Sequence, residues 1–170
     1  GNHLIHILRR NLDINILLFN NEIYGLTKGQ YSPTSKQGMV AKSTPYGSLE
    51  TPLNPISFAL NAQASFVARS IDNDAQHLGE MLKAAIAHKG TSFIEILQNC
   101  VVFNDKAFSA LRDKSTREQH ILTLREKEPL LFSHGQKGIG IDFSSLSPML
   151  IESDLKNAMI HDPSSLAKAQ

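Results

Sequence analysis

An apolar run passes directly into a polar, glycine-containing loop in the segment Ile14-Asn15-Ile16-Leu17-Leu18-Phe19-Asn20-Asn21-Glu22-Ile23-Tyr24-Gly25-Leu26-Thr27-Lys28-Gly29-Gln30. Only Asn15 interrupts the apolar run between Ile14 and Phe19. Such a run, bounded by polar turn residues, predicts a strand that is buried on both faces, as in a parallel sheet. The two asparagines follow at the point where that strand would end.

The loop after this predicted strand has the chemistry of a cation site. In open α/β sheets, ligands bind in the crevice beyond the carboxyl ends of the strands. Asn20 and Asn21 offer neutral carbonyl oxygens of the kind that Mg²⁺ takes in octahedral geometry, and Gly25 and Gly29 let the backbone approach a bound group. The residues therefore indicate either an oxygen-ligand metal with a phosphate, or an ordinary polar turn with two glycines.

Strands and helices are expected to alternate along residues 3–97. Asn54-Pro55 is typical of a helix start, with Asn as the N-cap and Pro at the first helical position. A later amphipathic stripe predicts a helix that Asp74 caps and Gly90 ends. Strand, helix and strand in succession imply parallel pairing. The predicted elements are helices over residues 3–10 and 105–114 and after Asn54 and Asp74, and strands over residues 14–19, 65–69 and 92–97.

Gln98-Asn99-Cys100 follows the predicted strand at residues 92–97 and should lie at the same carboxyl edge as Asn21. A lone cysteine is ordinarily a small buried hydrophobic residue, but this position at a sheet edge weakens that interpretation. Residues 31–53 are rich in Ser, Thr, Pro and Gly, and a loop of that length is usually functional or mobile. It would either cover a cofactor or dock a partner, or it would be a flexible surface excursion.

The C-terminal part carries weaker signals. Residues 117–128 mix both charges and suggest a solvated face, and Pro129–Phe132 suggests an edge strand. The glycine-rich segment at residues 135–140 does not connect a clear strand to a clear helix, so it is interpreted as a turn and not as a phosphate loop. Residues 153–170 suggest one short helix and a frayed end.

Composition limits the classes of protein. The chain has 170 residues, 41% hydrophobic residues and a net charge of +1, which is ordinary globular material without an electrostatic footprint for nucleic acid. No apolar run approaches the roughly 20 residues of a membrane span, and no signal peptide is recognised. The single cysteine excludes an internal disulfide framework and fits a reducing cytoplasm.

Three segments resemble the beta subunit of 2-oxoacid:ferredoxin oxidoreductases, namely Gly1–His6, Phe19–Ser35 and Gln98–Cys100. The resemblance implies an α/β, three-layer thiamine-diphosphate-binding fold: a mostly parallel sheet with helices on both faces, incomplete at the N-terminus. Residues 1–140 would form the diphosphate-gripping domain and residues 141–170 a C-terminal extension. The family places a Gly-Asp-Gly-Asp motif and a cysteine motif before the position of Gly1, so we expect an N-terminally truncated chain.

The resemblance also assigns roles to particular residues. The Asn21 side chain and the Ile23 backbone carbonyl would bind Mg²⁺, while Gly25 and Leu26 would line thiamine diphosphate. Cys100 would be one of four thiolates on a [4Fe–4S] cluster, with the other three upstream of this sequence. The activating carboxylate belongs to the alpha subunit in this family, so no catalytic acid or base is assigned here. His3 is either a packing or surface residue or a direct cofactor contact.

The implied reaction is oxidative decarboxylation of a 2-oxoacid, 2-oxoglutarate or pyruvate, to acyl-CoA with electrons passed to ferredoxin. The implied partners are the alpha subunit, ferredoxin, the 2-oxoacid and coenzyme A in the cytoplasm, without nucleic acid or membrane, and the 170-residue chain alone should be inactive. Two alternatives remain: a non-catalytic scaffold of the same fold, and half of a non-oxidative decarboxylase, which has no use for Cys100.

Overall fold

The computed structural model describes residues 2–165, and its chain divides into the units Gly1–Phe108 and Ser109–Gln170. The first unit holds every residue that the sequence predicts for a site. The expected cofactor domain, residues 1–140, extends beyond the division at Phe108. Its end near residue 140 stays a prediction. Within residues 2–165 we find no helix with the length and apolar character that crossing a bilayer requires.

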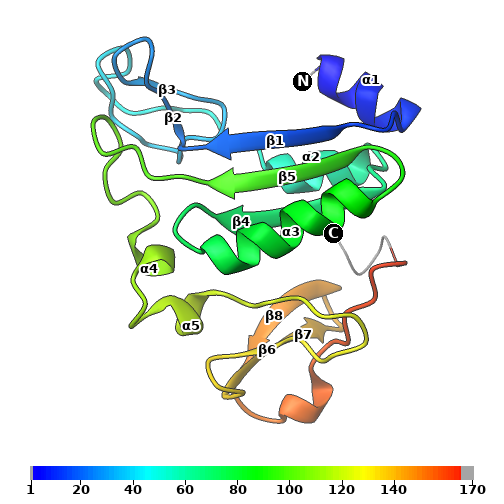
Figure 1. Ribbon diagram of the computed structural model, residues 1–170. Coiled ribbons are helices and arrows are strands. Elements are labelled where there is room, and N and C mark those ends of the chain that lie inside the picture. The colour runs from blue at the N-terminus through cyan, green and yellow to red at the C-terminus, as the bar shows by residue number, and fades with distance from the viewer. Residues whose placement is uncertain (1, 166–170) are drawn as a thin grey trace. The chain divides into compact units, whose positions relative to one another are not determined.

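A parallel sheet forms the centre of the first unit. Its strands are β1 (Asn15–Asn20), β5 (Ser92–Leu97) and β4 (Phe66–Ile71), in the order β1-β5-β4 (Figure 1). Both pairings are parallel, and Leu97 is the partner of Asn20 on one side and of Ile71 on the other. The three strands therefore end together, and the predicted parallel α/β arrangement is confirmed.

Helices cover both faces of this sheet. α1 (Asn2–Arg10) and α2 (Pro55–Asn61) lie on one face and α3 (Ala75–Ala87) on the other (Figure 1). Neighbouring residues of a strand point to opposite faces, so Phe93 packs with Leu8 of α1 and Ala59 of α2, while Ile94 packs under α3 with Ala85. The predicted three-layer fold is confirmed.

Both predicted helix starts are confirmed by side-chain caps. The Asn54 side-chain oxygen accepts hydrogen bonds from the amides of Ile56 and Ser57, each at 3.1 Å, and Pro55 occupies the first helical position. The Asp74 carboxylate accepts a bond from the His77 amide at 3.1 Å at the start of α3. Such caps satisfy amides that the first helical turn leaves unpaired.

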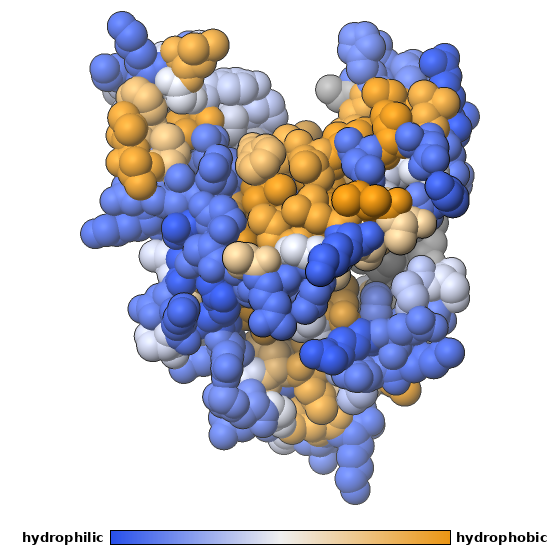
Figure 2. All heavy atoms as spheres, in the orientation of Figure 1, coloured by the Kyte–Doolittle hydropathy of each residue, from blue (hydrophilic) through white to orange (hydrophobic). Residues whose placement is uncertain are grey.

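The expectation that β1 is buried on both faces is wrong. Leu17 and Phe19 are 40% and 57% exposed, and Figure 2 shows hydrophobic surface over β1. The two side chains are on the α3 face of the sheet, in register with Ile94 and Ile96. They are exposed because β1 is the last strand of the described sheet and α3 packs on β4 and β5.

The segment after β1 contains a two-stranded ribbon that the sequence did not predict. β2 (Ile23–Tyr24) pairs antiparallel with β3 (Gln30–Tyr31), which returns the chain to the sheet edge. Between Tyr31 and α2 the described chain forms turns and one isolated bridge, Ala41 with Thr44, without a helix or a longer strand. The predicted long loop is therefore confirmed.

The second unit is an antiparallel sheet in the order β6-β7-β8 with short helices. Its edge strand β6 confirms the strand predicted at Pro129–Phe132. The expected turn at residues 135–140 is wrong beyond Gln136, because Gly138 and Gly140 lie in a strand. The elements are α4 (Ser109–Arg112), α5 (Arg117–His120), β6 (Leu131–Phe132), β7 (Lys137–Asp142), β8 (Ser147–Ile151) and the 3₁₀ helix η1 (Leu155–Asn157).

Two boundary errors have local causes. Glycine is depleted in strands. A side chain at Gly138 in β7 would meet Leu131 of β6 and Ile151 of β8, so the antiparallel sheet requires a small residue there. The helix expected over residues 105–114 begins only at Ser109, because Lys106 has a φ of 68° and its amide bonds the Asn99 side chain instead. The expected C-terminal helix is the short η1, and residues 166–170 lie outside the described part.

Two truncations of neighbouring strand positions test this account of burial. Ile94→Ala removes a side chain with no exposed surface and should destabilise the protein by about 2–5 kcal/mol, as core truncations do. Leu17→Ala, its in-register neighbour on the open face, should cost less than about half as much. Urea unfolding of both variants measures the difference, and equal losses would contradict the assignment of an open face to β1.

Candidate functional site

The two loops that leave β1 and β5 are hydrogen-bonded to each other at the carboxyl edge of the sheet. The Gln98 amide donates to the Asn20 carbonyl at 2.9 Å, and the Asn104 side chain donates to the Asn21 carbonyl at 3.0 Å. The Asn104 amide also bonds the Cys100 carbonyl at 3.0 Å. The prediction that the Asn21 and Cys100 segments share this edge is confirmed.

Asn21 is fixed by a short local turn. Its side-chain oxygen accepts a hydrogen bond from the Ile23 amide at 3.2 Å, and Glu22 between them has a φ of 55°. Asparagine favours such turns because its side chain mimics a backbone carbonyl. Asn21 is half-buried, whereas the Ile23 side chain is buried and anchors the start of β2. The two predicted metal ligands are therefore neighbours in one constrained turn.

A buried polar network lies directly behind this turn, and sequence reasoning missed it. The Asn20 side-chain nitrogen donates to Glu95 at 2.7 Å, and Arg69 Nε donates to the other Glu95 oxygen at 2.7 Å. The Asn20 side-chain oxygen accepts from the Thr34 hydroxyl at 2.7 Å. The available signal was a glutamate inside the apolar strand Ser-Phe-Ile-Glu-Ile-Leu, since an unpaired carboxylate is rarely buried.

Glu22 is the titratable group nearest to the proposed ligands. Burial raises the pKa of its carboxyl group above the ordinary value, Lys36 opposes the rise, and Glu95 adds to it. The Glu22 amide donates to the Asn20 side-chain oxygen at 3.1 Å, and its carbonyl accepts a hydrogen bond from the Ser35 hydroxyl. Glu22 is thus held through its backbone, which fixes the direction of the turn.

A tight turn follows between β2 and β3. The Lys28 amide donates to the Gly25 carbonyl and the Gly29 amide to the Tyr24 carbonyl, both at 3.0 Å. Gly29 has a φ of 95°, and a side chain there would meet the ring of Phe103 at 3.0 Å. The Leu26 side chain at the tip is 98% exposed. Of the predicted cofactor-lining pair, Leu26 is open to solvent, whereas Gly25 is half-buried beside Phe103.

The long loop is attached to this site at its start. Thr34 bonds Asn20, and the Ser35 hydroxyl both bonds the Glu22 carbonyl and accepts a bond from the Ser32 amide at 2.7 Å. Further along, Tyr46 is fully exposed. The loop is therefore ordered where it meets the turn, which favours a role at the site over a free excursion.

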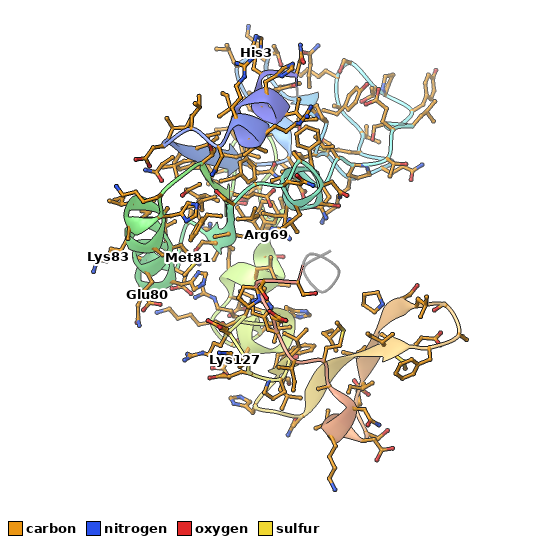
Figure 3. The ribbon with its side chains drawn as sticks, turned by 90° about the vertical axis from the view of Figure 1, so that its right-hand side faces the viewer. His3, Arg69, Glu80, Met81, Lys83 and Lys127 are labelled. Atoms are coloured by element: carbon orange, nitrogen blue, oxygen red, sulfur yellow. The ribbon has the colours of Figure 1, made fainter. Side chains whose placement is uncertain are left out.

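Cys100 and His3 have different surroundings. Cys100 is a half-buried free thiol and the only cysteine of the sequence. Four thiolates hold a [4Fe–4S] cluster, so the chain supplies at most one ligand. His3 is exposed at the start of α1, pointing away from the sheet (Figure 3). Its contact with a cofactor stays a prediction.

The donor atoms at the turn fit part of a magnesium site. Mg²⁺ binds oxygen ligands and retains several waters, so it needs few protein groups. Asn21 supplies an amide oxygen that is already oriented by the Ile23 amide, and no group of three or more His, Cys, Asp or Glu in residues 2–165 offers a competing site. The exposed Leu26 next to Gly25 fits the approach of a bulky cofactor.

Comparisons with known proteins give the chain a family. Residues 1–96 match the family described as thiamine pyrophosphate enzyme, C-terminal TPP binding domain, TPP being another name for thiamine diphosphate. The chain is 49% identical to the 2-oxoglutarate oxidoreductase subunit KorB of Mycobacterium tuberculosis, over 96% of this chain and 45% of that relative. It is 48% identical to the beta subunit of 2-oxoacid:ferredoxin oxidoreductase 1 of Aeropyrum pernix, over 61% of this chain and 32% of that relative.

A solved structure of a related enzyme is also similar to this chain. The 2-oxoglutarate:ferredoxin oxidoreductase from Magnetococcus marinus, with 2-oxoglutarate, coenzyme A and succinyl-CoA bound, superposes with a TM-score of 0.61 and 40% identity, over 62% of this chain and 36% of that chain. The chain thus spans less than half the length of these relatives. The resemblance to the beta subunit is confirmed, and the chain belongs to the thiamine pyrophosphate enzyme family, whose C-terminal TPP-binding domain it matches.

Proposed function

We propose that the chain is part of the beta subunit of a 2-oxoacid:ferredoxin oxidoreductase that converts a 2-oxoacid to acyl-CoA. The observation that carries this proposal is the joining of the Asn21 turn and the Cys100 segment at one sheet edge by Asn104 and Gln98. A cofactor site and a redox site have to be close for electrons to pass between them. The names of the relatives support the same activity.

The substrate that we favour is 2-oxoglutarate, with pyruvate as the second choice. The relative in M. tuberculosis is a 2-oxoglutarate oxidoreductase subunit, and the similar solved enzyme holds 2-oxoglutarate and coenzyme A. In the balanced reaction, the 2-oxoacid anion and coenzyme A give acyl-CoA, CO₂ and one proton, and two electrons leave to ferredoxin. We place this enzyme, with its alpha subunit, in the cytoplasm.

Asn21 and Ile23 would hold Mg²⁺ in this enzyme through the side-chain amide oxygen and the backbone carbonyl oxygen. The Asx turn at Asn21 orients its amide before any metal arrives, which lowers the ordering that binding requires. Gly25 and Leu26 would line thiamine diphosphate, with Gly25 letting the backbone approach it closely. When bound, thiamine diphosphate supplies the electron sink for loss of CO₂ from the 2-oxoacid.

Cys100 would contribute one thiolate to a [4Fe–4S] cluster. The backbone bridge between Cys100 and Asn104, and the bond from Asn104 to the Asn21 carbonyl, hold that thiol at the edge where the cofactor would bind. The other three thiolates would come from outside these 170 residues, because the sequence has a single cysteine. For that reason we expect the isolated chain to be inactive.

Neither alternative function explains why Asn21 and Cys100 lie at one sheet edge. A scaffold of the same fold needs neither the oriented amide at Asn21 nor a cysteine in the adjoining segment. A non-oxidative decarboxylase needs the cofactor but has no use for Cys100. Anaerobic cluster reconstitution on the full-length protein separates the three, because only the oxidoreductase should assemble a cysteine-bound cluster.

Asn21→Ala in the complete enzyme should weaken binding of Mg²⁺ and thiamine diphosphate by on the order of tenfold or more, since it removes a direct oxygen ligand. Stability should change little, because the side chain is half-buried at a loop. Titration calorimetry measures the affinity, with Asn61→Ala on the exposed end of α2 as the control. Unaltered cofactor affinity in Asn21→Ala would remove this residue from the site.

Cys100→Ala should abolish electron transfer to ferredoxin in the complete enzyme while sparing cofactor binding, because Asn21 and Ile23 are untouched. Iron and sulfide analysis, electron paramagnetic resonance and calorimetry on one preparation provide the three readouts. Val101→Ala, at an exposed neighbouring position, is the control. A full [4Fe–4S] signal with normal ferredoxin reduction in Cys100→Ala would show that the thiol is only a packing residue.

A further inference from the structure

Glu95 is a buried carboxylate in the middle of β5. Its side chain is 1% exposed, and its strand neighbours Ile94 and Ile96 are core residues. A buried charge is costly unless it is paired and hydrogen-bonded. A hydrophobic residue would serve the core better, so the presence of this carboxylate calls for an explanation in its contacts.

The two oxygens of Glu95 take one donor each from the neighbouring strands. Oε2 accepts from Arg69 Nε on β4 at 2.7 Å, and Oε1 accepts from Asn20 Nδ2 at the end of β1 at 2.7 Å. Arg69 is nearly half exposed, so solvent screens part of its attraction. Glu95 therefore connects all three strands through a single carboxylate.

The contact with Glu95 determines which way the Asn20 amide faces. A carboxylate only accepts hydrogen bonds, so Asn20 has to present its nitrogen to Glu95 and its oxygen to the loop. That oxygen accepts from the Glu22 amide at 3.1 Å and from the Thr34 hydroxyl at 2.7 Å. Reversing the amide would place a donor against the Glu22 amide, and the Thr34 hydroxyl would have to rotate so that it accepts instead of donating.

We propose that Glu95 is a positioning residue that holds the turn at Asn21–Ile23, and the start of the long loop, in the geometry that receives the metal and the cofactor. The inference rests on the proposed function for its ligand. Glu95 acts through Asn20, whose oxygen fixes the Glu22 amide between the two proposed ligands and fixes Thr34 on the loop beside them. It touches neither cofactor nor substrate.

A neutral glutamine cannot replace this carboxylate. The amide introduced by Glu95→Gln would have one oxygen and one amino group, so it would satisfy either Arg69 or Asn20 and would oppose a donor to the other. The contact with Asn20 would then be lost or the Asn20 amide would turn over. The proposal therefore predicts that Glu95→Gln loosens the loop although the size and shape of the side chain are preserved.

Glu95→Gln in the complete enzyme is the first test. Hydrogen exchange of the segment 20–35 in the cofactor-free protein should become faster, and calorimetry should show binding of Mg²⁺ and thiamine diphosphate weakened by on the order of tenfold. The control is Glu80→Gln, which makes the same charge change on the outer face of α3, pointing away from the sheet (Figure 3). It should leave both readouts unchanged.

A double-mutant cycle separates positioning from a general loss of stability. Asn20→Ala removes the group through which Glu95 acts, so adding Glu95→Gln to it should weaken binding no further. If Glu95→Gln does not fold, Thr34→Val removes only the hydroxyl on the far side of Asn20 and should also speed exchange and weaken binding. Unchanged affinity in this variant would overturn the proposal.

Three further results would overturn the inference: unchanged exchange of residues 20–35 in Glu95→Gln, faster exchange with unchanged cofactor affinity, or losses of affinity that add in the double variant. Failure of the proposed function gives a different result. A scaffold would not bind Mg²⁺ and thiamine diphosphate, and a non-oxidative decarboxylase would bind them without assembling a cluster. In both cases the exchange measurement would still show whether Glu95 holds the turn.

Discussion

Parallel pairing of β5 with both β1 and β4 is the constraint on which the rest of the first unit depends. Because Asn20, Leu97 and Ile71 are aligned, the three strands release their following loops at one edge. Segments far apart in sequence, around Asn21 and Asn104, are thereby placed within hydrogen-bond distance. This is the general position of ligand sites in open α/β sheets.

The same edge combines buried polar contacts with an exposed loop tip. Below it, Glu95 connects Arg69 and Asn20 inside the sheet, and the amides of the turn are satisfied by the Asn20 and Asn21 side chains. Above it, Leu26 at the β2–β3 turn is exposed to solvent. Residues that bind a ligand are held most accurately when their own positions are fixed by buried contacts behind them.

Much of this arrangement could be predicted from the sequence. The helix caps at Asn54 and Asp74 and the apolar run of β5 are local signals, and the order of the elements implied parallel pairing. The edge position of β1 could not be predicted, because an apolar run looks the same whether or not a helix covers its second face. Glycine-containing β7 was missed for a related reason: its stability comes from partner strands and not from its own residue preferences.

The candidate site, like the fold, could be predicted only in part. Asn21, Ile23, Gly25, Leu26 and Cys100 were recognised from short motifs, and their roles stay predictions. The Glu95 network was missed because Arg69 and Glu95 belong to no motif and are far in sequence from Asn20 and Thr34. The register of the strands brings Arg69 and Glu95 to Asn20, and the long loop brings Thr34 there. Long-range polar contacts of this kind carry little local signal.

The most direct test of the central claim, that the sheet edge at Asn21 is the metal–cofactor site, is a crystal structure of the complete enzyme with thiamine diphosphate and Mn²⁺ in place of Mg²⁺. Both ions prefer oxygen ligands, and manganese gives an anomalous signal that identifies its position. We expect a manganese peak bound by the Asn21 side-chain oxygen and the Ile23 carbonyl oxygen. A fully occupied peak that neither residue contacts would contradict it.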